Sequence, residues 1–225
     1  MGIESQVART PSTSGSPPRT GGPVRPVYAG SLESAPFITV VSGLPRSGTS
    51  MMMQMLAAGG IPLLTDGVRA PDWDNPRGYF EFEPVKRTRQ DPSWVPIAVG
   101  KAVKMVTILL RDLPPDFEYR VILMYRDPKE VLASQKAMLD RRNQTGAEAS
   151  DERLKSLFQK ELERTRQWME AQPNFRALQV AHGDCIGDPA VVTGSVNLFL
   201  DGKLDVPEMT RVVDGALYRK MADRI

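Results

Sequence analysis

The sequence predicts an α/β protein in which a parallel sheet carries helices on both faces, a three-layer arrangement. Short apolar runs rich in β-branched residues alternate along the 225-residue chain with stretches that have helical periodicity or helix-start signals. There is no internal repeat. Strands separated by helices pair in parallel through right-handed crossovers, and such sheets bind ligands where their strands end.

The first half of the chain supplies two of the expected strands. FITVVS, residues 37–42, is a short buried strand, and residues 49–58 follow as a helix that ends at Gly59-Gly60. Residues 65–78 form a turn-rich loop whose length is typical of a lid or binding loop. Residues 101–110 begin like a strand and are then ambiguous between strand and helix.

The second half continues the alternation. Residues 119–125 read as a buried strand, and Asp127-Pro128, with Glu130 at the third position, has the pattern of a helix start. The remaining expected elements are a polar loop at 141–150, a helix at about 151–171, a strand at 175–181, and helices opening at Asp188-Pro189 and after Pro207.

Composition separates residues 1–36 from the rest. This segment is rich in Pro, Gly, Ser and Thr and has almost no large apolar side chains, so we expect a disordered tail. It lacks the apolar core of a secretory signal. Residues 37–225 then form one domain of ordinary size, with the carboxyl ends of its strands as the expected site.

Charge and residue counts exclude several classes of protein. A net charge of +2 gives no electrostatic case for a nucleic-acid or membrane partner, and no apolar run is long enough for a membrane span. The only cysteine, Cys185, cannot form an intrachain disulfide, and the only histidine, His182, excludes a multi-histidine metal site. We expect a soluble protein of a reducing compartment, the cytoplasm.

GLPRSGTS, residues 43–50, directly follows the first strand and has the spacing of a phosphate-binding P-loop. Gly43 and Gly48 let backbone N–H groups turn toward an anion, and the following helix adds the positive end of its dipole. The usual lysine is replaced by Thr49, and the nearby cation is Arg46 inside the loop. The alternative is a tight strand-to-helix turn that binds no ligand.

The motifs PRSGTS and, after a later strand, YRDP with a serine eight residues beyond its arginine resemble the sulfotransferase superfamily. NPRGYFE, residues 75–81, resembles a subset of small members of it. The resemblance covers nearly all of 37–225 and implies a fold similar to P-loop kinases. It also implies 3′-phosphoadenosine 5′-phosphosulfate (PAPS) as the sulfuryl donor. The implied 5′-phosphosulfate loop consists of Pro45, Arg46, Ser47, Gly48, Thr49 and Ser50.

The resemblance assigns the donor's 3′-phosphate to Arg126 and Ser134. The residues themselves favour such a site, because Arg126 ends an apolar strand and Ser134 shares an apolar helix face with Val131 and Met138. The alternatives are a surface ion pair for Arg126 and a bond from Ser134 to its own helix backbone. Asp127 fits a helix cap better than a magnesium ligand.

Sulfuryl transfer is mainly a matter of positioning and charge stabilisation, so no metal is required. Arg46 would stabilise the leaving phosphate, and Lys104 falls where many members place a lysine near the sulfuryl group; an ordinary surface lysine is the alternative. Val106 stands where many members have a histidine base. The candidate bases are Asp66, Asp74, Glu81 and Glu83, with Glu81 preferred and Asp66 next, although each also fits a solvated loop carboxylate.

His182 aligns with a tyrosine of the family and would stack on the adenine, although a lone histidine also fits a structural role. The family's C-terminal R-K-G loop is absent, since LYRKMADRI offers only Arg219 and Lys220 without a glycine. The prediction is a PAPS-dependent sulfotransferase acting on a hydroxyl or amine acceptor. Two alternatives remain: a non-catalytic nucleotide-binding or interaction protein on the same fold, and a small P-loop kinase or NTPase.

Overall fold

The computed structural model describes residues 36–72, 75, 77–141 and 151–213 of the chain. Its centre is a sheet of four parallel strands in the order β2-β1-β3-β4. The strands are β1 (Phe37–Gly43), β2 (Ala102–Val106), β3 (Glu118–Tyr125) and β4 (Phe175–Ala181). Because β1 lies between β2 and β3, the loop that follows it emerges near the middle of the carboxyl edge of the sheet.

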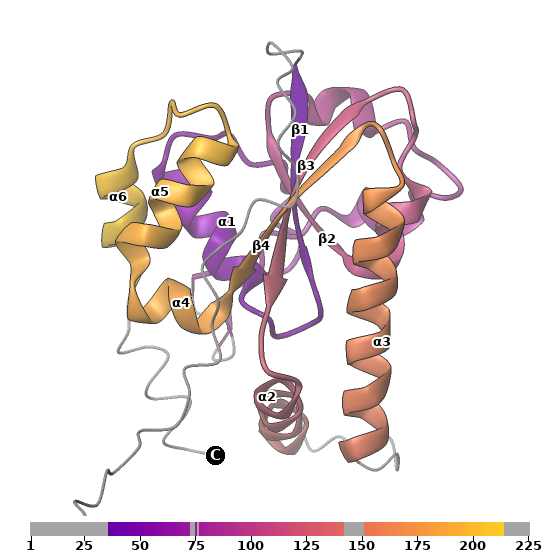
Figure 1. Ribbon diagram of the computed structural model, residues 1–225, viewed down its shortest axis with the longest axis vertical. Helices are drawn as coiled ribbons and strands as arrows, with labels where there is room; N and C mark the ends of the chain where they lie inside the picture. The colour runs from indigo at the N-terminus through magenta and orange to yellow at the C-terminus, as the bar shows by residue number, and fades with distance from the viewer. Residues whose placement is uncertain (1–35, 73–74, 76, 142–150, 214–225) are drawn as a thin grey trace, which may run out of the picture.

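Helices cover both faces of this sheet, so the predicted three-layer α/β architecture is confirmed (Figure 1). One face carries α1 (Thr49–Ala58), α4 (His182–Gly187), α5 (Pro189–Phe199) and α6 (Val206–Arg211). The other carries α3 (Asp151–Glu170) and the 3-10 helices η1 (Glu83–Arg87), η2 (Val95–Ala98) and η3 (Thr107–Asp112). Helix α2 (Pro128–Arg141) follows β3 beyond the carboxyl edge and packs beside α3.

Each face of the sheet has its own hydrophobic core, because successive strand residues point to opposite sides. Val40 belongs to the core under α3 and Val41 to the core under α1. The methionines of α1 fill the second core, with exposed fractions of 0–3%. Burying one such side chain contributes about 1.5–3 kcal/mol, so these methionines bind α1 firmly to β1 and hold its first turn at the sheet edge.

The structure differs from the predicted elements in three places. The ambiguous segment 101–110 is a strand only to Val106 and then turns into η3. Helices η1 and η2 were not predicted; both are short and begin next to a proline. The six-residue α4 was also missed and begins at His182 itself. The described residues do not include 1–35 of the predicted tail, 142–150 of the predicted loop, the candidate base Asp74, or Arg219 and Lys220. Residue 141, predicted to begin that loop, is the last residue of α2.

Candidate anion-binding site

The P-loop, Gly43–Ser50, leads from β1 into α1 and presents an uncapped helix start. Gly48 is the N-cap residue with φ +96°, and no side chain accepts from the first turn, which also contains no acidic residue. The first N–H groups of a helix have no partner within the helix, and the helix dipole makes this end positive. The start of α1 therefore presents backbone N–H groups that are suited to binding an anion.

The loop also contains a buried hydroxyl that lacks a hydrogen bond. Ser47 is 1% exposed, and its Oγ has no partner among the described residues. Gly43 makes room for it, because a Cβ at Gly43 would lie 2.4 Å from Ser47 Oγ and 2.7 Å from the Met124 carbonyl oxygen. Burying a hydroxyl without a partner is costly, so a phosphate oxygen in the loop is a chemically suitable acceptor for it.

Arg46 connects the P-loop to the end of β3 and to α2. Its Nε donates to Ser134 Oγ at 3.0 Å, and its carbonyl oxygen accepts from Arg126 Nη1 at 3.3 Å. Arg126 also forms an ion pair with Glu130 at 2.9 Å. The structure therefore brings together the three residues predicted to bind phosphate, and it also contains the ion pair that was the alternative for Arg126.

Ser134 is 6% exposed and accepts from Arg46, so its hydroxyl faces the P-loop rather than only its own helix backbone. Asp127 has the predicted role of a helix cap. Its Oδ1 accepts from Lys129 N at 2.8 Å, and its carbonyl oxygen accepts from Val131 N. Within the described ranges, no three His, Cys, Asp or Glu side chains gather closely enough to hold a metal ion.

Lys104 lies on the other side of the P-loop, near the end of β2. Its Nζ donates to the Tyr79 carbonyl oxygen and lies 3.4 Å from Ser50 Oγ and 3.8 Å from Glu81 Oε1. The side chain is only 13% exposed. Burial lowers the pKa of Lys104 to about 8, although the nearby Glu81 carboxylate opposes the change. The residue is a partly desolvated cation at the site, not an ordinary surface lysine.

The two preferred base candidates have different surroundings. Asp66 accepts from the backbone N–H groups of Val68, at 3.0 Å, and Glu83, at 2.5 Å. These bonds hold the pKa of Asp66 below its usual value, which makes it a poorer proton acceptor. Glu81 lies beside three cations, Arg69 at 2.9 Å, Lys104 at 3.8 Å and Lys86 at 3.9 Å. Of these two carboxylates, Glu81 is the one that lies close to Lys104.

His182 packs directly against the P-loop. It is 4% exposed, and a Cβ at Gly48 would lie 2.6 Å from its Cδ2. Burial, together with the charge of Arg126, lowers the pKa of His182 to about 3, so the ring is neutral near pH 7. This position favours a structural role, in which the His182 ring packs against the P-loop, over stacking on an adenine. Of the other predicted loop residues, Pro45 is exposed and Thr49 begins α1.

Three residues in or directly after the long loop also contact the site, and the sequence analysis gave them no individual role. Asn75 Nδ2 donates to Ser50 Oγ at 2.8 Å. Tyr79 is 6% exposed and donates its hydroxyl to Asp72, while the guanidinium of Arg69 lies 3.3 Å from the centre of the Tyr79 ring. Asn75 and Tyr79 were signalled by the NPRGYFE motif, whereas Arg69 had no signal.

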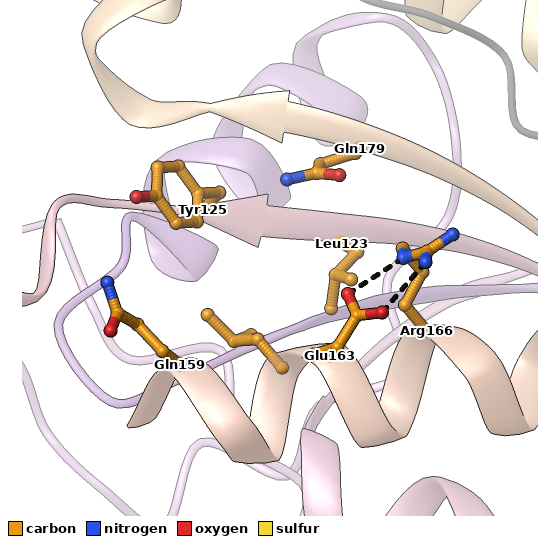
Figure 2. A pocket seen from close by; sticks show the side chains of 7 residues that line it. Leu123, Tyr125, Gln159, Glu163, Arg166 and Gln179 are labelled. Atoms are coloured by element: carbon orange, nitrogen blue, oxygen red, sulfur yellow. Dashed lines mark hydrogen bonds and ion pairs between the residues drawn. The ribbon is translucent and has the colours of Figure 1, made fainter. Parts of the chain in front are cut away.

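A cavity of about 210 Å³ opens elsewhere, between α3 and the last residues of β3 and β4 (Figure 2). Its wall includes the Glu163–Arg166 ion pair at 2.9 Å, and Tyr125 and Gln179 lie on the sheet side. None of the predicted site residues lines it, although Tyr125 immediately precedes Arg126. The predicted site residues around the P-loop therefore lie outside the lining of this cavity.

Solved structures similar to this chain include sulfotransferases and a sugar kinase. The sulfotransferase domain from the curacin biosynthetic pathway is 16% identical, with a TM-score of 0.48 over 81% of this chain and 80% of that one. The sulfotransferase domain of the Synechococcus PCC 7002 olefin synthase is 18% identical, with a TM-score of 0.48 over 82% and 86%. An unliganded sugar kinase from Janibacter sp. HTCC2649 is 13% identical, with a TM-score of 0.41 over 80% and 99%.

No protein-family model and no curated protein matches this chain. The roles of individual residues rest on the contacts of this chain alone. In the part of the chain that the structure describes, no helix is both long and apolar enough to cross a membrane.

Proposed function

We propose that this chain is a sulfotransferase-like protein whose P-loop binds PAPS and transfers its sulfuryl group to a hydroxyl or amine acceptor. The observation that carries the proposal is the double contact of Arg46 with Ser134 and Arg126. It joins the P-loop to the end of β3, the two positions that we propose for the phosphates. A donor with phosphates on both its 5′ and 3′ positions matches that arrangement.

The described residues fit such a donor. The first N–H groups of α1 and the buried Ser47 hydroxyl would bind the 5′-phosphate, and Arg126 and Ser134 would bind the 3′-phosphate. Bound PAPS would supply a sulfuryl group on a phosphate leaving group. Arg46, within the P-loop, and Lys104, beside Ser50, are two cations that would stabilise negative charge there.

Calorimetry with 3′-phosphoadenosine 5′-phosphate (PAP), compared with ATP in the presence and absence of Mg²⁺, tests the donor. We expect PAP to bind with an affinity that is the same with and without Mg²⁺. ATP binding that requires Mg²⁺, without PAP binding, would instead support the kinase or NTPase alternative.

A second candidate function is nucleotide binding without catalysis. The observation in its favour is that both preferred bases are engaged: Asp66 by backbone N–H groups, and Glu81 by an ion pair with Arg69. Turnover of PAPS with a panel of alcohols, phenols and amines separates the two functions. PAP binding without any transfer to the panel would favour the binding protein.

A further inference from the structure

We infer that Glu81 is a positioning residue, which holds the Lys104 ammonium beside Ser50 of the P-loop and maintains its charge. The inference deepens the proposed function and rests on it for its catalytic meaning. It gives Glu81 a role other than that of general base. The contacts themselves can be tested on the protein without any ligand.

Lys104 needs a negative partner because its surroundings otherwise disfavour a cation. The side chain is 13% exposed, and its two hydrogen-bond acceptors, the Tyr79 carbonyl and the Ser50 hydroxyl, carry no net charge. Among the groups that set its pKa, Glu81 favours the charged form, whereas burial and the positive charges of Arg69 and Lys86 oppose it. Without Glu81 a desolvated amine would remain between cations.

Glu81 is itself held in place by the long loop. Arg69 forms an ion pair with Glu81 Oε1 at 2.9 Å, and the same guanidinium lies over the Tyr79 ring. Tyr79 is buried, and its carbonyl oxygen accepts from Lys104. Arg69, Tyr79 and Glu81 thus form one connected unit that contacts Lys104 at two points.

A carboxylate held between cations is suited to fixing charge, whereas a general base must be available to take a proton from an acceptor. The charge of Lys104 is what a phosphosulfate in the P-loop would need from this side of the site. Since the pKa of Lys104 is about 8, that charge is present at pH 7 and is lost as the pH rises through 8. Loss of Glu81 would move this change to lower pH.

The first test measures the titration of Lys104 directly. In the full chain labelled with ¹³C-lysine, the Cε signal that disappears in Lys104→Arg is followed by NMR from pH 6 to pH 11. We expect Glu81→Gln to raise the proton dissociation constant of Lys104 about tenfold or more, because an opposite charge within 4–6 Å is lost. Arg69→Gln should change it in the opposite direction, because a repelling cation is removed.

Glu83→Gln is the matched control. Glu83 pairs with the same Lys86 that lies near Glu81, but its side chain is exposed, and the charges that shift the pKa of Lys104 come from Glu81, Arg69 and Lys86. We expect the Lys104 titration to be nearly unchanged in this variant. A Lys104 midpoint that is the same in wild type and Glu81→Gln overturns the inference. If Glu81→Gln does not fold, Glu81→Asp decides: its shorter carboxylate lies farther from Lys104 and should raise the proton dissociation constant of Lys104, and an unchanged constant overturns the inference.

The second test links the charge to the ligand. PAPS affinity is measured between pH 6.5 and 9 for wild type, Glu81→Gln and Glu83→Gln. We expect the affinity to fall at high pH in wild type and at lower pH in Glu81→Gln. Absence of PAPS binding in wild type would overturn the proposed function, whereas the NMR titration would still decide the role of Glu81. An unchanged pH dependence in Glu81→Gln would overturn the inference alone.

Discussion

Gly48 occupies a position where both backbone conformation and space require glycine. Its φ is +96°, and a Cβ would lie 2.6 Å from the ring of His182. The ring cannot move away easily, since it is buried at the start of α4. Gly48 and His182 therefore pack closely where α1 begins and β4 ends.

Gly48→Ala should lower the free energy of unfolding by about 1–2 kcal/mol for the left-handed conformation alone and by more because of the clash. Gly60→Ala is the matched control, because Gly60 has φ +93° and a Cβ there would meet nothing within 4 Å. Urea denaturation of both variants measures how much each substitution lowers the free energy of unfolding. Equal losses in both would show that His182 moves aside without cost.

Arg126 should contribute to binding of one phosphate of PAP and not of the other. Removing a charge-assisted hydrogen bond costs about 1.5–3 kcal/mol, which corresponds to an affinity loss of about 10–150-fold. We expect Arg126→Ala to weaken PAP by this factor and adenosine 5′-phosphate much less, measured by calorimetry. Lys129→Ala, an exposed cation at the start of the same helix, should leave both affinities nearly unchanged. A similar weakening of both ligands would contradict the assignment of the 3′-phosphate to Arg126.

At the scale of the elements, the sequence was sufficient to predict an element where a single segment contained the whole characteristic pattern. The β-branched run 37–43 followed by GLPRSGTS predicted β1, the P-loop and α1 together, and Asp127-Pro128 predicted the start of α2. The positions of Arg126 and Ser134 followed from these elements. By contrast, η1 and η2 have no hydrophobic period of their own, and their place depends on packing against the sheet.

The connected unit around Lys104 could not be predicted for a related reason. Arg69 and Tyr79 lie in an irregular loop, and their contact depends on how that loop folds back onto β2. Glu81 was selected from the sequence as a carboxylate near the site, but its partners were not visible there. Periodicity places residues on a face of an element and says nothing of contacts between loop residues.

The N-cap of α2 should matter both for stability and for the site, because α2 carries Ser134. Asp127→Ala removes the bond from Lys129 N to Asp127 Oδ1 and should lower stability by about 0.5–2 kcal/mol. Asp188→Ala is the matched control, since Asp188 caps α5 in the same Asp-Pro pattern. We expect similar losses of stability in denaturant, with weaker PAP binding only for Asp127→Ala. Equal effects on PAP would mean that the start of α2 does not position the site.

On the scale of the whole molecule, residues 37–225 are predicted to form the folding unit. Deleting residues 1–36 should leave the melting temperature and PAP affinity unchanged, because that segment has little apolar surface to bury. A deletion that also removes Phe37 should be destabilising, because β1 begins there and the guanidinium of Arg120 lies 3.7 Å from the centre of its ring. A drop of several degrees on removing 1–36 would contradict the predicted boundary.

The parallel order of the sheet has a consequence for the time course of folding. β1 leaves the ribosome first, yet both of its partners lie much later in the chain: Thr39 pairs with Ala102 and with Arg120. The chain must close long loops before any strand of this sheet is paired, which slows folding. Until β2 has been synthesised, the apolar β1 segment is an unpaired strand and is prone to aggregation. During synthesis, the segment that ends in the P-loop is therefore the one most in need of a chaperone.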